Sequence, residues 1–192
     1  SAEVIFHHFD PAPSLLSNAR AKIDSNLFKT YDVNDLRRKV FFTNTTDNSP
    51  GFKGSYDGNG LYGAYGIFDG LATDELFLIR AECHARNNDA NAAIADLNKL
   101  MEKRWDKTAW IPFTASDAQD ALNKVLMERR KELIYRGLRW SDIRRFNVAG
   151  ANITLYRNVA GANLPPNDMR TVMLIPQEEI NLSGIPQNPR QL

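Results

Sequence analysis

The sequence is poor in the residues that most often carry covalent or metal chemistry. Its single cysteine, Cys83, excludes an intramolecular disulfide and a metal site built from several thiolates, and we expect this residue in the core. The three histidines show no arrangement with an acid and a nucleophile of the kind that hydrolase or transferase chemistry needs. We therefore predict no enzyme activity, no metal and no cofactor.

Two further absences concern partners. No apolar run of about 18 residues occurs, so the chain itself is expected to be soluble. Lys and Arg number 24 against 23 Asp and Glu, and a net charge of +1 creates no global field that would attract nucleic acid or an anionic membrane. Hydrophobic residues at 43% and charged residues at 24% are typical of a folded globular protein, so we predict one compact unit.

The chain changes character near residue 70. Residues 1–70 hold short apolar clusters between runs of Asn, Asp, Ser, Thr and Gly, which predicts a loop-rich region that packs on the rest. One helix is expected near 12–26, where apolar residues recur at spacings of three and four. Segments 39–42 and 52–56 are too short for their periodicity to be decisive and are expected to be irregular, or else to form a hairpin.

Residues 71–192 carry helical patterns. A helix is predicted over 73–87, where Leu76, Ile79 and Cys83 recur at helical spacing. A second is predicted over 90–104, antiparallel to the first, with alanines that let the two backbones approach. Two such helices joined by a short turn form a helical hairpin of the tetratricopeptide kind.

Two more helices are predicted downstream. One spans 117–136 and stops at Gly137, and a shorter one spans 140–146. The proline-rich tail after them is expected to be an extended strap laid on the domain, with one turn of helix at 177–181. The predicted fold class is mainly α, a tetratricopeptide-like helical-hairpin region with long irregular loops.

A basic cluster lies within residues 128–145, where seven Lys or Arg against three Asp or Glu give +4. Arg129 falls on the apolar stripe of its helix, so we expect it to be partly buried and paired with Glu82 or Asp142. Trp140 is expected to fill the core beside this network. Because no groove-reading module surrounds the cluster, a structural network is favoured and no nucleic acid is expected.

Aromatic residues in loops are the candidates for a ligand site. A flat ring exposed in a loop can stack on the apolar face of a sugar, while neighbouring polar groups bond its hydroxyls. The alternative is that such rings only hold their loops against the core. The candidates for sugar stacking are Tyr56, Tyr62, Tyr65, Trp105 and Trp110.

Residues 127–133 (MERRKEL) and 137–145 (GLRWSDIRR) closely resemble the ERR-x-EL…G-x-RW-x-D-x-x-R signature of the SusD/RagB-like glycan-binding outer-membrane lipoproteins. The resemblance covers about residues 32–190, and several motifs agree in order, which argues against chance. The other matching stretches are 35–38 (DLRR), 76–82 (LFLIRAE), 91–98 (NAAIADLN) and 173–180 (MLIPQEEI).

This resemblance implies a SusD-like fold of which the chain is a C-terminal region, 71–192 being its helical part, and hence a fragment of a larger protein. The intact protein would be a surface-exposed lipoprotein of the outer membrane of a Bacteroidetes bacterium, held only by a lipid anchor absent from this chain. It would capture an oligosaccharide or polysaccharide without cleaving it, for import through a partner SusC-like TonB-dependent transporter.

The residues also leave a second class of function open. A tetratricopeptide-like region can serve as a protein–protein interaction module without sugar binding. That alternative would be favoured by a strongly apolar groove between the helices predicted at 73–87 and 90–104, whereas aromatic loops flanked by polar groups would favour sugar.

Overall fold

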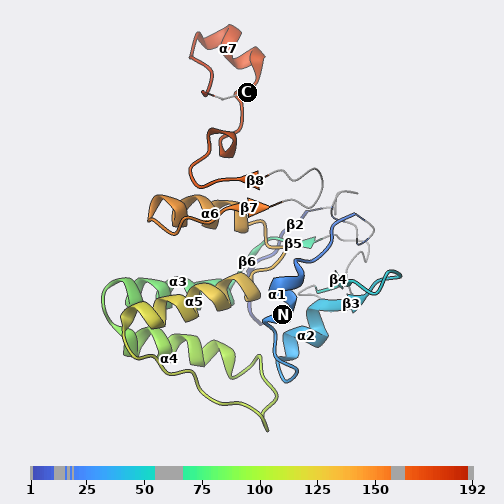
Figure 1. The fold of residues 1–192 in the computed structure, drawn as a ribbon, viewed down its shortest axis with the longest axis vertical. Coiled ribbons are helices and arrows are strands. Elements are labelled where there is room, and N and C mark those ends of the chain that lie inside the picture. Colours follow the sequence, from blue (N-terminus) through green and yellow to red (C-terminus); the bar gives the residue numbers. More distant parts are fainter. Residues whose placement is uncertain are drawn as a thin grey trace. The chain divides into compact units, whose positions relative to one another are not determined.

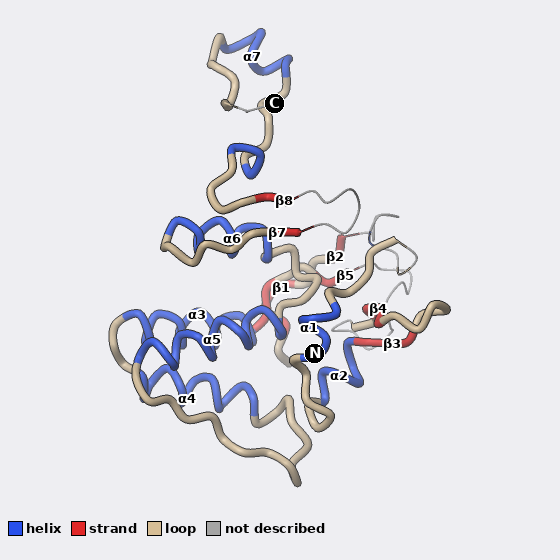
Figure 2. Tube along the Cα trace, viewed as in Figure 1, coloured by secondary structure: helices blue, strands red, loops and turns tan. Residues whose placement is uncertain are grey.

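A computed structural model shows a mainly helical chain, which confirms the predicted fold class (Figure 2). The chain divides into two compact units, Ser1–Gly137 and Leu138–Leu192. Within the described ranges, strands form only two-stranded antiparallel ladders. The residues that the structure describes are 2–10, 16, 18, 20–54, 67–156 and 163–189.

Three long helices lie side by side in the first unit (Figure 1). They are α3 (Thr73–Arg86), α4 (Ala90–Met101) and α5 (Ala118–Glu132), which confirms the three helices expected there. The Asp89 carboxylate caps α4 by accepting from the Ala92 amide, and Asp117 caps α5 in the same way.

The seam between these helices is built from small side chains. Ala85 of α3, Ala93 of α4 and Ala121 of α5 are buried in one cluster. Alanine at each contact lets the backbones approach closely, which agrees with the helical hairpin predicted from composition.

The expectation that Cys83 lies in the core is wrong, because the thiol is exposed. Leu76 and Ile79, at helical spacing with it, are 54% and 43% exposed. The sequence of α3 carries two candidate faces, and the buried one contains the small residues that fit against α4 and α5. The buried residues of α3 are Asp74, Leu78, Ala81, Glu82 and Ala85.

Helix α5 ends at Glu132, four residues before the predicted end. Tyr135 adopts a positive φ of 62°, which is uncommon for a bulky residue, and its ring stacks on Phe52 with centroids 4.3 Å apart. Gly137 follows with φ +72° and nothing within 4 Å of the position where a Cβ would stand. The chain therefore leaves α5 through a turn that needs left-handed backbone at two positions.

We expect Gly137→Ala to lower the free energy of unfolding by about 1 kcal/mol, because a Cβ disfavours the left-handed conformation even where space is free. Gly137→Asn is the matched control, since asparagine tolerates this conformation better than alanine. Urea denaturation of the three proteins measures the order. Equal stability of the alanine variant and the wild type would contradict a backbone requirement here.

Two short ladders join the N-terminal residues to the segment around position 70, and one of them crosses that position. The register pairs Val4 with Ala72 in one ladder and Phe9 with Phe68 in the other. The loop-rich region therefore shares strands with the segment that leads into α3. The strands are β1 (Val4–Phe6) with β6 (Leu71–Ala72), and β2 (Phe9–Asp10) with β5 (Ile67–Phe68).

The loop-rich region contains two short helices and a hairpin. Of the helix expected near 12–26, residues 12–15, 17 and 19 lie outside the described residues. Residues 21–24 are not helical, and α1 (Ser25–Lys29) begins only at the end of the expected span. The Asp24 carboxylate, which accepts from the Asn26 amide, fixes that start. Next come α2 (Leu36–Phe41) and a hairpin of β3 (Phe42–Asn44) and β4 (Pro50–Phe52), so a hairpin forms where the sequence left it as the alternative.

An aromatic cluster holds these elements together. Tyr31 and Phe42 are buried and meet edge to face with ring centroids 5.0 Å apart. Phe52 of β4 joins the same cluster, together with buried Ile23 and Leu27. The hydrophobic core of the loop-rich region is therefore mainly aromatic.

The second unit contains α6 (Arg139–Val148) and short elements after it. Trp140 is 42% exposed, so the prediction that it fills the core is wrong. Helix α6 buries Ile143, Phe146 and Asn147. Trp140 lies in the first turn of this helix, ahead of these buried residues. The helix expected at 177–181 is α7 (Gln177–Ser183), and the remaining elements are β7 (Leu155–Tyr156), β8 (Asn163–Leu164) and η2 (Met169–Thr171).

None of the helices in the described ranges has the length and apolar character needed to span a membrane.

Candidate functional site

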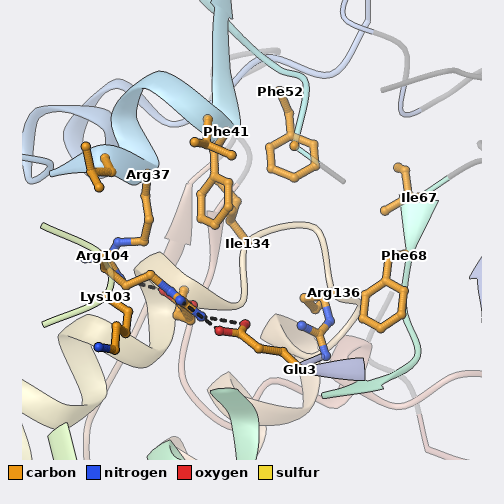
Figure 3. A pocket seen from close by; sticks show the side chains of 14 residues that line it. Glu3, Arg37, Phe41, Phe52, Ile67, Phe68, Lys103, Arg104, Ile134 and Arg136 are labelled. Atoms are coloured by element: carbon orange, nitrogen blue, oxygen red, sulfur yellow. Dashed lines mark hydrogen bonds and ion pairs between the residues drawn. The ribbon is translucent and has the colours of Figure 1, made fainter. Parts of the chain in front are cut away.

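The first unit contains a cavity of about 310 Å³ with an apolar wall and a charged floor (Figure 3). The wall comes from α2, β4, β5 and the turn after α5, and the floor from charged side chains on several segments. The apolar lining includes Phe41, Phe52, Ile67, Phe68 and Ile134, and the charged lining is Glu3, Arg37, Lys103, Arg104, Glu132 and Arg136.

Arg37 is the centre of the charged floor. Its side chain is 2% exposed and contacts three carboxylates: Asp35 at 2.7 Å, Glu128 at 2.5 Å and Glu132 at 2.9 Å. Burial disfavours the guanidinium charge, but the three carboxylates outweigh burial and hold the pKa of Arg37 well above its usual range. Arg37 is therefore a permanently charged cross-link between α2 and α5.

Lys131 and Tyr31 extend this network on one side. The Lys131 ammonium lies 2.9 Å from Glu128 and 3.2 Å from Asp35, and the Tyr31 hydroxyl donates to the Lys131 carbonyl at 2.8 Å. Burial, the largest cause, raises the pKa of Tyr31 far above its usual value, so this hydroxyl remains a neutral donor.

Arg104 extends it on the other side, toward the N-terminal segment. Its guanidinium bridges Glu132 at 2.6 Å and Glu3 at 2.9 Å. Burial opposes the charge, yet these two carboxylates outweigh it and raise the pKa of Arg104 above its usual range. Because the buried cations of the floor are paired with carboxylates, the cavity offers a ligand apolar surface rather than free charge.

Arg136 forms the third charged contact of the cavity. It donates to Asp74 at 3.2 Å and to the Gly70 carbonyl at 2.8 Å, and its guanidinium lies 4.7 Å from the centroid of the Phe68 ring. Asp74 is completely buried, and burial raises the pKa of its carboxyl to about 6 against the lowering effect of Arg136. The Asp74 carboxyl therefore titrates in the mildly acidic range.

Arg129, Glu82 and Asp142, which the sequence placed in one network, each form an ion pair with a further residue. Arg129 is buried, as predicted, and its guanidinium lies 3.5 Å from the Glu75 carboxylate. Glu82 pairs with Arg86 at 2.8 Å, and Asp142 pairs with Arg145 at 2.9 Å. The pairing of Arg129 with Glu82 or Asp142 stays a prediction.

The two candidate tryptophans come together in the loop between α4 and α5. Trp105 and Trp110 are both half-buried, with ring centroids 6.0 Å apart and planes inclined at 52°, and Trp110 also meets Phe113 edge to face at 5.9 Å. Asn98 fixes Phe113 through two hydrogen bonds to its backbone, of 2.9 and 2.8 Å. We call these three rings the aromatic platform.

The other candidates for sugar stacking, Tyr56, Tyr62 and Tyr65, lie outside the described residues. Within those that are described, no group of three or more His, Cys, Asp or Glu side chains is placed to hold a metal ion.

The SusD family profile matches residues 74–189. The structure resembles a SusD-like carbohydrate-binding protein from Bacteroides vulgatus ATCC 8482, with 22% identity and a TM-score of 0.57 over 85% of this chain and 40% of that one. It also resembles a SusD superfamily protein from Bacteroides fragilis NCTC 9343, with 17% identity, a TM-score of 0.56, and coverage of 88% and 40%. A search of curated proteins finds no match.

A SusD superfamily protein from Bacteroides vulgatus ATCC 8482 gives a TM-score of 0.58 at 22% identity, over 82% of this chain and 36% of that one. At these identities the structural likeness establishes the fold, and the chain spans two fifths or less of the length of each of these structures. The profile covers more than half of the chain and includes α3, α4, α5 and the segment through α7. The chain belongs to the SusD family.

Proposed function

We propose that this protein binds an oligosaccharide or polysaccharide without cleaving it. The observation that carries the proposal is membership of the SusD family, supported by the likeness of the fold to a SusD-like carbohydrate-binding protein. The intact protein would act at the surface of the outer membrane as a lipid-anchored protein, and would pass the glycan to a SusC-like TonB-dependent transporter.

The aromatic platform is the proposed sugar contact. Trp110 is half-buried and keeps part of its ring accessible, while its neighbour Ile111 is 81% exposed. Asp106, Lys107 and Thr108 in the same loop supply polar groups at the surface. A ring held by its neighbours can stack on the apolar face of a sugar with little loss of side-chain entropy.

The tetratricopeptide-like interaction module is the weaker alternative. It would need an apolar groove between α3 and α4, but buried Ala85 and Ala93 fill that seam together with Ala121. Close packing at these positions argues against a peptide groove along this seam.

Trp110→Ala is expected to weaken binding of a glycan by roughly threefold to tenfold, because one stacking contact is lost. The glycan is first identified by an array screen of the chain, and affinities are then measured by tryptophan fluorescence. Trp140→Ala is the matched control, since Trp140 is an exposed tryptophan outside the platform. Trp110→Phe retains a ring and should restore most of the affinity.

Two results would count against the proposal. Equal affinity of wild type and Trp110→Ala for the same glycan would remove the platform as the contact. A folded chain that binds no glycan on the array would contradict glycan capture by this region.

A further inference from the structure

A second hollow, of about 360 Å³, lies beside α1, α2 and the β3–β4 hairpin. This volume falls within the range of about 300–1,000 Å³ that is usual for small-molecule sites. The lining contains two cations and no acidic residue. Its members are Phe28, Val33, Arg38, Lys39, Phe42, Thr43, Asn44 and Pro50.

Arg38 is held in place on two sides. Its guanidinium lies 4.6 Å from the centroid of the Phe28 ring, and Nη1 donates to the Tyr31 carbonyl at 2.8 Å. Phe28 is itself fixed by an edge-to-face contact with buried Phe42, with ring centroids 5.2 Å apart. The guanidinium is therefore ordered before any ligand arrives, which lowers the entropic cost of binding.

Neither Arg38 nor Lys39 forms an ion pair with a carboxylate of the described residues, whereas the neighbouring acids are engaged elsewhere. Asp35 pairs with Arg37, and Asp47 pairs with Lys22 at 2.8 Å. Asp106 stays ionised and attracts Lys39, but the described residues show no ion-pair contact between them. The lining of the hollow itself therefore carries two cations and no anion.

The remaining lining suits a sugar ring. Thr43 and Asn44 are exposed and present a hydroxyl and an amide, which can bond sugar hydroxyls in both directions. Val33, 68% exposed, and half-buried Phe28 and Pro50 offer apolar surface for the C–H face of a ring. A fixed guanidinium and an exposed ammonium beside mixed polar and apolar groups match a ligand that carries all three kinds of surface.

We propose that this hollow binds an anionic sugar residue of the captured glycan, whose carboxylate or sulfate group is held by Arg38 and Lys39. The inference rests on the proposed glycan binding and narrows it to acidic glycans. A uronate and a sulfate ester share the chemistry that the two cations recognise, so the ligand class is an acidic saccharide.

The test measures binding of the chain to matched pairs of oligosaccharides by isothermal titration calorimetry. Oligogalacturonate is compared with its uncharged methyl ester, and a sulfated galactan oligosaccharide with its desulfated form. We expect the charged member of at least one pair to bind about tenfold more tightly than its uncharged counterpart, and more weakly as salt rises. The pair that shows this difference identifies carboxylate or sulfate as the recognised group.

Lys39→Gln removes one cation without touching the core, because Lys39 is exposed. It should weaken binding of the charged ligand about tenfold and leave the uncharged ligand unchanged, and Lys39→Arg should restore affinity. Lys29→Gln is the matched control, since Lys29 is an exposed lysine on α1 that does not line the hollow. Melting temperatures verify that all variants are folded.

Two outcomes overturn the inference, and they differ in what they say about glycan binding. Binding of uncharged glycans alone, or equal affinity of Lys39→Gln and Lys29→Gln for the charged ligand, would reject the acidic-sugar site and leave glycan binding intact. A folded chain that binds neither charged nor uncharged glycans would reject both.

Discussion

Replacing Arg37 with alanine is expected to lower the free energy of unfolding by about 3–5 kcal/mol, enough to prevent folding of a marginally stable domain. Removing the guanidinium leaves the carboxylates of Asp35, Glu128 and Glu132 buried without their shared partner. Lys131 and Arg104 neutralise part of this charge, but neither replaces the contact between α2 and α5. Urea denaturation monitored by circular dichroism measures the loss.

Two other variants separate charge from geometry. Arg37→Lys keeps the charge but loses the planar fork that reaches three carboxylates, so its stability should fall between the alanine variant and the wild type. Arg80→Ala is the matched surface control, because the Arg80 side chain is 62% exposed although it lies 2.5 Å from Asp96. Its effect should be small. An Arg37→Ala protein as stable as Arg80→Ala would refute the role given to the network.

The helices of the first unit were predictable because their signals are local. Apolar spacing and the capping residue Asp117 fix α5 within its own segment, and the alanines of α4 are visible in a short window. The face of α3 was not predictable. Its exposed stripe at Leu76 and Ile79 is more apolar than its buried face, which includes Asp74 and Glu82, and only contact with two other helices selects between them.

The buried network around Arg37 was not predicted from the sequence, for a different reason. Arg37 contacts Glu128 and Glu132, which lie 91 and 95 residues away along the chain. Charged residues are usually exposed, so a run such as residues 128–132 suggests solvent contact when it is considered alone. One feature of the sequence could have indicated this network: Glu128 and Glu132 are four residues apart, so their carboxylates lie on one face of the helix.

In the candidate sites, too, one part was predictable from the local sequence and another was not. Trp105 and Trp110 were predictable as loop aromatics, and the structure brings their rings to 6.0 Å. The hollow with Arg38 and Lys39 was not, because the sequence around it contains acids as well as bases. Only the structure reveals that Asp35 and Asp47 are paired elsewhere.

Wild-type protein is expected to lose stability relative to Asp74→Asn as pH rises from about 4 to about 7. Burial raises the pKa of Asp74 to about 6, whereas the unfolded chain has the ordinary value of 3.8. Below pH 3.8 the Asp74 carboxyl is protonated in both the folded and the unfolded state, and the stabilisation from its raised pKa is fully present. Between 3.8 and 6 only the folded state keeps the proton, so stability falls as pH rises, and above 6 the decline ends.

The size of this decline follows from the two pKa values. A folded-state pKa of about 6 in place of 3.8 corresponds to roughly 3 kcal/mol, and the asparagine variant, which cannot ionise, should not show it. The asparagine carbonyl can still accept from Arg136, so the contact with the guanidinium survives at every pH. Denaturant titrations of both proteins at several pH values give the difference directly.

Asp168→Asn serves as the control for this experiment, because the Asp168 carboxyl titrates below the range from about pH 4 to about pH 7. Arg170 lowers the pKa of Asp168 to about 2, so the stability linked to this group is present above 3.8 and is lost only as pH falls toward 2. The difference in stability between wild type and Asp168→Asn should therefore be flat from about pH 4 to about pH 7.

If Asp74→Asn gives an equally flat difference from wild type, Asp74 is ionised throughout that range. Arg136 would then outweigh burial, and the pair would be an ordinary buried ion pair with no response to mild acid.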